Sequence, residues 1–174
     1  MYLSLLKDKS RLQEIYDLRV IAWERSSRKG VITKDKWPNG WHEEIDHEAF
    51  NFIIENDSGR IIASARISIH EQLDELPYPS AFQNFSLPEA RPFAFYSRLV
   101  VHPDFRSHLL YKELDGARIA LLEEKRIPFA IVTCPHKRLK SLMEAGFEIL
   151  GKTWVDFYGT VICEYALLYK TTTI

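Results

Sequence analysis

The chain has 174 residues, a length typical of one domain, and 46% of them are hydrophobic and 27% charged, which is the balance of a globular protein. Its 23 basic and 24 acidic side chains give a formal net charge of −1, which argues against nucleic acid as a partner. The apolar run Met1–Leu6 is too short for a signal peptide or a membrane span. We therefore expect a single cytoplasmic domain over residues 1–174, with no membrane partner.

The cysteine count argues against a disulfide framework. Only Cys134 and Cys163 are present, and no Cys or His pair has the spacing of zinc ligands. We expect two buried, reduced thiols and no metal ion.

The N-terminal third predicts a strand, a helix and a loop. Residues 1–6 form a candidate strand, and Ser10 can cap a helix that continues through about Ser27 because apolar residues recur at helical spacing. Residues 31–48 contain Pro38, Gly40 and two tryptophans, which indicates a loop.

A hairpin and a long excursion follow. Residues 50–55 and 61–69 are strand-like runs, and the turn-rich segment 56–60 joins them. Residues 71–92 contain four prolines, so we expect an excursion from the sheet and not a strand.

The remaining chain alternates strands and helices. An aromatic and β-branched strand over 93–101 leads through His-Pro-Asp-Phe into a helix. We expect the later elements to be a helix over 109–125, a buried strand over 129–133, a helix over 137–145 closed by Gly146, and final strands over 148–157 and 161–169.

The segment Ser97–Arg106 reads Ser-Arg-Leu-Val-Val-His-Pro-Asp-Phe-Arg, and a helix, a strand, a short helix and Gly146-Phe147 come after it. This order resembles the GNAT acyltransferase superfamily over nearly the whole chain. The resemblance implies an α/β (α+β) fold, a mixed and mainly antiparallel sheet flanked by helices. It also implies that the sheet is splayed at the strand before the donor-binding turn.

That turn predicts a donor site. A helix N-terminus offers backbone N–H groups and a positive dipole end to an anion, and a splayed strand can pair with a pantetheine arm. The resemblance implies that the donor is acetyl-CoA or acyl-CoA, or the pantetheine of acyl carrier protein. The predicted binding residues are Leu99, Val100, Val101, Arg106, Ser107, His108, Leu109, Leu110 and Tyr111.

Two departures from the GNAT pattern bear on this prediction. Leu109 and Tyr111 stand where the family has glycines, so each adds a Cβ where a phosphate would approach bare backbone. Leu142 stands where many members have a tyrosine that protonates the leaving thiolate. Either Tyr158 or Tyr96 supplies that acid, or the thiolate leaves unassisted.

A second set of residues resembles the acyl-homoserine-lactone synthases and the related N-acyl amino acid synthases, which have the GNAT fold. Lactone synthases carry an acidic residue three positions before the arginine that matches Arg98, and this chain has Phe95 there. The resemblance therefore favours a related N-acyltransferase, with acyl carrier protein as an alternative donor. The features that carry it are Arg19, Trp23, the loop that contains Trp37 and Trp41, Glu43, Asp46, the hairpin ending in Ala65-Arg66, the Leu- and Pro-rich excursion, and Ser97-Arg98.

We predict Arg98, Tyr96 and Glu71 as the catalytic residues. In the alternative interpretation, the arginines pair structurally with Glu43, Asp46 or Glu71, because buried charges are normally paired. The tryptophans either pack in the core or form a substrate box. We interpret His70, His102 and His136 as loop or cap residues.

The predicted function is transfer of an acyl or acetyl group to a small amine or amino acid by direct attack, with a homodimer as a candidate assembly. The alternatives are a non-catalytic acyl-CoA-binding module, ordinary acetyl transfer and an autoinducer synthase. We expect an acyl group longer than acetyl if the aromatic residues of strand 93–101 and of the excursion line an acyl slot; otherwise these side chains fill the core. They are Phe93, Phe95, Tyr96, Leu76, Tyr78, Phe82 and Phe85.

Overall fold

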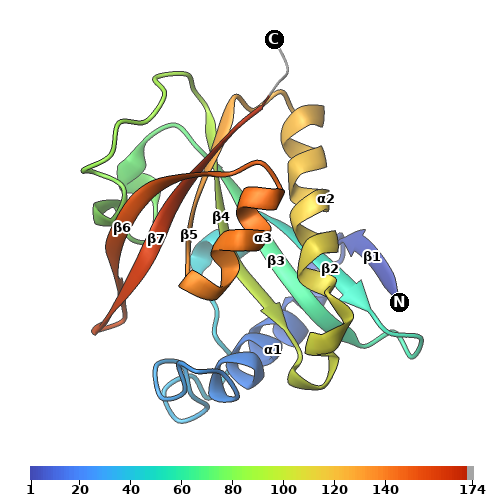
Figure 1. Cartoon of the computed structure of the whole chain (residues 1–174). Coiled ribbons are helices and arrows are strands. Elements are labelled where there is room, and N and C mark those ends of the chain that lie inside the picture. The colour runs from blue at the N-terminus through green and yellow to red at the C-terminus, as the bar shows by residue number, and fades with distance from the viewer. Residues whose placement is uncertain (172–174) are drawn as a thin grey trace. The chain divides into compact units, whose positions relative to one another are not determined.

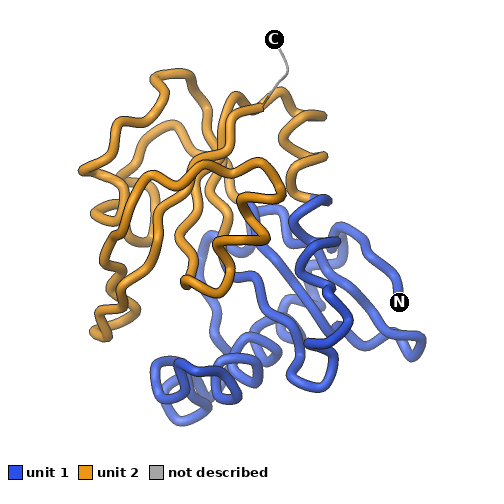
Figure 2. Tube along the Cα trace, viewed as in Figure 1, with its two compact units in different colours: residues 1–67, 98–117 blue, residues 68–97, 118–174 orange. Residues whose placement is uncertain are grey.

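The computed structural model describes residues 1–171, which fall into two compact units interleaved along the chain (Figure 2). Unit 1 comprises Met1–Ile67 and Arg98–Ala117, and unit 2 comprises Ser68–Ser97 and the chain from Arg118 onward. A single domain over residues 1–174 stays a prediction.

The described residues form a mixed sheet whose strands are ordered β1-β2-β3-β4-β5-β7-β6 (Figure 1). The pairs β1–β2, β2–β3, β5–β7 and β6–β7 are antiparallel, and β4–β5 is parallel. The predicted α/β class with a mainly antiparallel sheet is confirmed. The bounds are β1 Tyr2–Leu5, β2 Phe50–Glu55, β3 Ile61–His70, β4 Phe93–Val101, β5 Phe129–Cys134, β6 Glu148–Phe157 and β7 Thr160–Lys170.

Strand β4 pairs with β5 near its N-terminal end. Among the described residues, the register between them runs from Ala94 opposite Ala130 to Tyr96 opposite Val132. These pairs lie in the first half of β4, as the predicted splay requires. Beyond them, the N–H of His102 donates to the carbonyl oxygen of Ile62 in β3 at 2.7 Å.

Unit 1 is built around α1, Leu12–Glu24. Asp8, and not the predicted Ser10, caps the start of this segment, because its carboxylate accepts the N–H of Ser10 at 2.9 Å ahead of a short 3-10 helix. The buried face of α1 packs on residues of β2, β3 and β4 in one apolar cluster. Its members are Leu6, Leu12, Ile15, Tyr16, Leu18, Ala22, Ile53, Ile61 and Val100.

Helix α2, Leu110–Glu124, contributes its first half to unit 1 and its second half to unit 2. Unit 2 also contains α3, Leu139–Glu144, and the β6–β7 hairpin. Cys134 is buried, as expected. The burial predicted for Cys163 is wrong, because it lies opposite Trp154 on the outward side of the hairpin, where Trp154 is also exposed.

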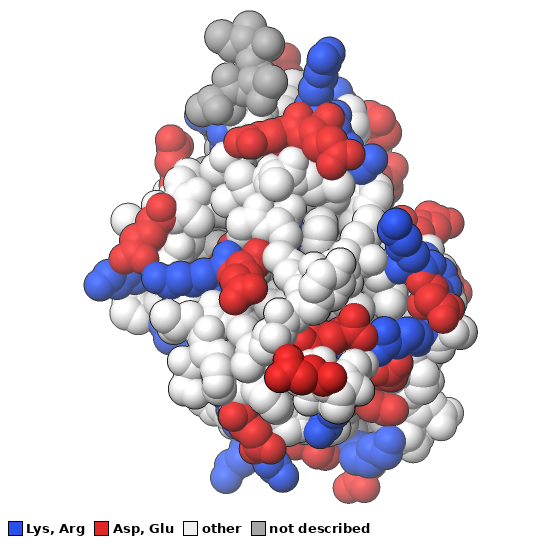
Figure 3. Space-filling view, turned by 90° about the vertical axis from the view of Figure 1, so that its right-hand side faces the viewer, with Lys and Arg blue, Asp and Glu red and all other residues white. Residues whose placement is uncertain are grey.

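The surface carries both signs of charge. On the face drawn in Figure 3, acidic and basic side chains lie scattered among uncharged residues, in keeping with the net charge of −1. No helix in the described part of the chain is both long and apolar enough to cross a membrane. The same residues contain no group of three or more His, Cys, Asp or Glu side chains that could hold a metal ion.

Candidate active site

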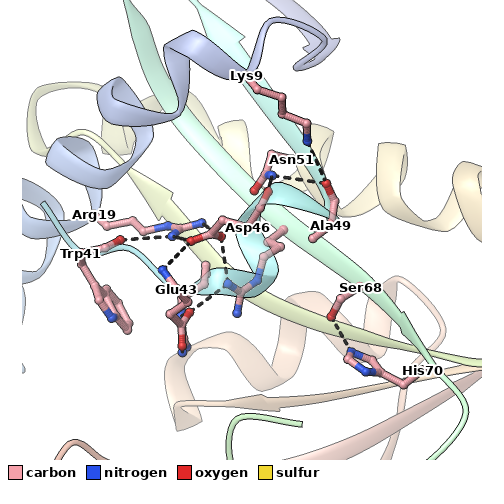
Figure 4. A network of polar contacts seen from close by, with 11 residues as sticks. Lys9, Arg19, Trp41, Glu43, Asp46, Ala49, Asn51, Ser68 and His70 are labelled. Carbon is pink, nitrogen blue, oxygen red and sulfur yellow. Dashed lines mark hydrogen bonds and ion pairs between the residues drawn. The ribbon is translucent and has the colours of Figure 1, made fainter. Parts of the chain in front are cut away.

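A buried network of charged side chains lies in unit 1 (Figure 4). Arg19 on α1 donates from Nη1 to Asp46 Oδ2 at 2.8 Å and from Nη2 to Asp46 Oδ1 at 2.7 Å. Nη1 also donates to the carbonyl oxygen of Trp41 at 3.1 Å. Both charged side chains are almost fully buried, so the two-point geometry compensates for the loss of water around them.

Arg66 joins the two carboxylates of this network. Its Nη1 lies 2.9 Å from Asp46 Oδ1 and 2.8 Å from Glu43 Oε2. Because β3 is buried on both faces, Arg66 has no exposed surface. A fully buried guanidinium requires such anionic partners.

Arg98 completes the network from β4. Its Nε donates to Glu43 Oε2 and its Nη2 to Glu43 Oε1, both at 2.6 Å. The guanidinium also lies 4.3 Å from the centre of the Trp41 ring, within the range of a cation–π contact. The ion pairing of the three arginines, the alternative to a catalytic role, is confirmed for Glu43 and Asp46.

The local sequence places the two carboxylates together. Glu43 precedes the 3-10 helix Glu44–His47, and its N–H donates to Asp46 Oδ2 at 2.9 Å in a capping box. Gly40 sets the entry to this segment, because its φ of +81° is left-handed and a Cβ there would lie 2.6 Å from Tyr16 Cβ. The chain therefore passes close to α1 just before it presents Trp41 and Glu43.

The electrostatics of the network keep the acids ionised. Burial alone would raise the pKa of Glu43, but the charges of Arg98, Arg66 and Arg19 hold its pKa far below the usual range. The pKa of Asp46 is also lowered, because Arg19 and Arg66 outweigh the effect of burial. These five side chains thus comprise three guanidinium groups and two carboxylates, a net charge of +1.

The backbone at Arg98 is strained. Its φ is +53°, a left-handed conformation inside a strand, which costs a non-glycine residue on the order of 1–3 kcal/mol. The two-point pair with Glu43 and the ring of Trp41 hold the side chain in place. Strained residues of this kind persist where surrounding contacts fix their conformation, and they cluster at active and ligand-binding sites.

Aromatic side chains border the network. Trp41 is fully buried and contacts Trp23 edge-on at 5.3 Å and Trp37 at 6.4 Å between ring centres. Trp23 and Trp37 are only partly buried. Trp41 is thus a core residue, whereas the side chains of Trp23 and Trp37 are partly exposed to solvent.

The turn after β4 contains Pro103–His108, a 3-10 helix, followed by α2. His102 caps it by accepting the N–H of Asp104, which confirms the predicted cap. Arg106 reaches back to α1 and donates to the carbonyl oxygens of Ala22 at 2.7 Å and Arg25 at 2.6 Å. Its guanidinium therefore satisfies carbonyl groups at a helix end.

Leu109 takes the conformation that a glycine would take. Its φ is +55°, and its side chain is 51% exposed at the junction with α2. The position has the left-handed backbone that glycine adopts readily, but it carries a side chain. Tyr111, the second glycine position, lies in the first turn of α2.

No protein-family model and no curated protein sequence matches this chain. Solved structures match it over nearly its whole length. The N-acyl amino acid synthase FeeM from uncultured soil microbes is 12% identical, with a TM-score of 0.66 over 97% of this chain and 90% of that one. A GNAT-family acetyltransferase from Staphylococcus aureus is 10% identical, with a TM-score of 0.64 over 97% and 99%.

The acyl-homoserine lactone synthase BjaI, solved with SAM and isopentyl-CoA, is 14% identical, with a TM-score of 0.71 over 94% of this chain and 78% of that one. This chain has the GNAT fold. The predicted likeness to both the acetyltransferases and the synthases is thus confirmed at the level of fold.

In this GNAT fold, the predicted catalytic residues Tyr96 and Glu71 belong to unit 2, whereas Arg98 belongs to unit 1. Tyr96 is buried, with the guanidinium of Arg118 4.2 Å from its ring centre. Glu71 is exposed at the surface, where its carbonyl oxygen accepts from Arg91 Nε at 2.9 Å. Their catalytic roles stay predictions.

The aromatic residues predicted to line an acyl slot pack together inside unit 2. Phe95 contacts Tyr78 and Phe82 at 5.5 and 6.1 Å between ring centres, and Phe93 stacks on Phe129 at 5.4 Å. All five are buried. Their mutual packing supports the alternative that they fill the core, so these rings give no support for a long acyl chain.

Sequence reasoning missed one group in this fold. His70 was expected in a loop or cap, and that expectation is wrong, because it is the last residue of β3 and is buried. Its ring nitrogens lie near Ser68 and Glu75. The spacing Ser-x-His at the end of a strand is a signal for this contact, since alternate residues share a face. His136 begins a short 3-10 helix.

Proposed function

We propose that this chain is an N-acyltransferase that moves an acyl or acetyl group from a CoA or carrier-protein thioester to an amine by direct attack. The observation that carries the proposal is the succession of β4, the turn and α2 within the GNAT fold, with left-handed backbone at Arg98 and Leu109. The similar structures named above carry the names of acyl-transfer enzymes, which supports this reaction class.

The donor is proposed to lie along Leu99–Val101 and the turn Arg106–Tyr111, all within unit 1. Three observations indicate weak binding of a phosphate at this turn. Arg106 already donates to a carbonyl oxygen of α1, and the Leu109 side chain lies at the turn. Glu113 adds a negative charge in the first turn of α2. Affinity then depends mainly on strand-like pairing with the pantetheine arm. A carrier-protein arm with one phosphate suits such a site as well as CoA does.

The chain's own groups have three tasks in the reaction. Alignment of amine and thioester supplies much of the rate, because it removes the entropy of bringing them together. A backbone N–H near Leu99 or Val100 meets the oxyanion that forms on the thioester carbonyl. A base or a water molecule takes the amine proton.

The acceptor is proposed to carry a carboxylate, as an amino acid does. The five-residue network in unit 1 has a net charge of +1 beside the partly exposed Trp23 and Trp37. A guanidinium binds a carboxylate through charge-assisted hydrogen bonds. The similarity to FeeM, an N-acyl amino acid synthase, supports this class of acceptor.

Two alternatives differ in measurable ways. A non-catalytic acyl-CoA-binding module would bind the donor without releasing thiol. A lactone synthase is disfavoured because Phe95, at the position of the acidic residue in that family, is buried among aromatic rings. A homodimer, acyl carrier protein as partner and a cytoplasmic location stay predictions.

The test combines binding and turnover. Thermal shift with CoA, acetyl-CoA, longer acyl-CoAs and acylated carrier protein measures binding, and a thiol-release assay with amino acids or their amides measures transfer. We expect a donor-dependent rise in Tm and faster thiol release with amino acids than with their amides. No shift and no release with any donor would overturn the proposal, whereas a shift without release would leave the binding module.

A further inference from the structure

Three side chains of unit 2 form a hydrogen-bonded series apart from the arginine network. Ser68 and His70 lie two positions apart on β3, so their side chains share a face of the strand. Ser68 Oγ is 2.7 Å from His70 Nε2 (Figure 4), and His70 Nδ1 is 3.4 Å from Glu75 Oε2. Ser68 and His70 are buried.

The surroundings fix both ends of this series. The His70 ring contacts Phe93 at 5.9 Å and Phe95 at 6.5 Å between ring centres. Glu75 Oε2 also accepts the backbone N–H of Glu71 at 3.0 Å, and this bond contributes most to a lowered pKa of the Glu75 carboxyl. Glu75 is therefore an ionised acceptor at neutral pH.

The direction of the hydrogen bonds follows from the carboxylate. An ionised carboxylate only accepts, so His70 Nδ1 must carry the proton that faces Glu75. In the neutral imidazole, Nε2 is then an acceptor, and Ser68 must donate its hydroxyl proton to it. This is the arrangement of nucleophile, base and orienting acid that activates a serine.

The buried imidazole of His70 has a polar neighbour at each ring nitrogen. A buried imidazole needs such a partner on both sides, because each ring nitrogen is a polar atom removed from water. Here each ring nitrogen faces a different side chain, and the carboxylate is itself held by the backbone. The orientation that results is the one that lets Ser68 lose its proton to His70.

We propose that Ser68 is a nucleophile that takes an acyl group from a thioester, with His70 as its base and Glu75 as the residue that positions His70. Ser68 Oγ bonds to the carbonyl carbon and passes its proton to His70 Nε2. The carbon–sulfur bond breaks, and the leaving sulfur takes that proton as a free thiol. Water then cleaves the ester, giving a carboxylic acid and restoring Ser68.

This activity is separate from direct transfer on β4, because it needs no amine acceptor. Its test uses a fluorophosphonate probe, which reacts covalently with activated serines, on the full chain. Intact mass measures the adduct and peptide mapping locates it. We expect one adduct, on Ser68, and slow thiol release from an acyl-CoA in the absence of any amine.

Three variants and one control make the test specific. Ser68→Ala should abolish the adduct, His70→Gln should slow labelling by about 100-fold or more, and Glu75→Gln should slow it by roughly tenfold. Ser64→Ala is the matched control, because Ser64 lies on the same face of β3 and is buried, and its labelling should equal that of the unaltered protein. Circular dichroism and Tm confirm that each variant is folded.

Two results would overturn the proposal: a folded protein that gives no adduct on Ser68, or labelling that is as fast in His70→Gln as in the unaltered protein. Neither result depends on acyl transfer to an amine. Conversely, a failure of the amine-transfer assay leaves the labelling of Ser68 unaffected, so the two proposals fail separately.

Discussion

Arg98 and Glu43, 55 residues apart in the sequence, are joined by two hydrogen bonds of 2.6 Å each, and the arginine holds this geometry from a left-handed position in β4. The planar fork of the guanidinium matches the two carboxylate oxygens and also faces the ring of Trp41. A lysine keeps the charge but offers neither the fork nor the flat face.

Arg98→Lys should therefore fold but lose activity. A hydrogen bond to a charged group contributes about 1.5–3 kcal/mol of free energy. If the variant loses one such bond, we expect kcat/KM for thiol release to fall by roughly 10- to 100-fold. Arg25→Lys is the control, because Arg25 is exposed and forms only a loose ion pair, at 3.7 Å, with the exposed Asp104. If Arg98→Lys turns over at the unaltered rate, Arg98 has only a structural role.

Arg106→Ala should reduce stability more than donor affinity. The arginine satisfies the carbonyl oxygens of Ala22 and Arg25 at the end of α1, and its loss leaves them to water. We expect the free energy of unfolding to fall by about 1–3 kcal/mol, measured by urea denaturation. A variant of unchanged stability that no longer responds to acyl-CoA in thermal shift would instead show that the Arg106 side chain binds the donor directly.

Leu109→Gly should stabilise the protein and favour CoA. Glycine adopts the φ of +55° without the cost of about 1–2 kcal/mol that a leucine bears, and it removes a side chain from the turn. We expect Tm to rise and the Kd for acyl-CoA to fall. The control, Tyr111→Gly, lies inside α2 and should destabilise by about 1 kcal/mol. Equal effects of the two glycines would contradict this assignment.

The sequence predicted the elements that depend on local pattern. Strands β2 to β7 were expected within one residue of their bounds, because alternation and turn residues are local signals. Ion pairs of Arg19 and Arg66 with Glu43 or Asp46 were among the alternatives open from the sequence, because buried charges are normally paired, and the structure selects them.

Other features depend on contacts that no local pattern encodes. Arg106 meets α1 across 84 residues of sequence, so its motif alone indicated a phosphate ligand. Whether Phe95 lines a slot or fills a core depends on Tyr78 and Phe82, which come from an irregular excursion. His70 was missed because its carboxylate partner, Glu75, lies on a short 3-10 helix in that same excursion.

The buried carboxylates of Glu43 and Asp46 should make the stability of the protein depend on pH in acid. Glu43 and Asp46 have folded-state pKa values below their ordinary values of 4.5 and 3.8, since nearby arginines outweigh the effect of burial. The unfolded chain therefore binds more protons in acid, so this stabilisation is complete above about pH 4.5 and is lost as the pH falls through the folded-state values. Urea denaturation between pH 7 and pH 3 should show a plateau and then a decline.

Asp46→Asn tests the source of this decline. Removing one partner of a buried pair costs about 3–5 kcal/mol, so the variant should be less stable at pH 7 by that amount. The gap between it and the unaltered protein should then narrow as the pH falls below about 3.8, because the unfolded chain, in which Asp46 has its ordinary pKa, takes up a proton there before the folded protein does. Asp57→Asn, which alters a fully exposed carboxylate, should follow the unaltered protein throughout. A constant gap between pH 7 and pH 3 would show that the buried charge of Asp46 is not what acid removes.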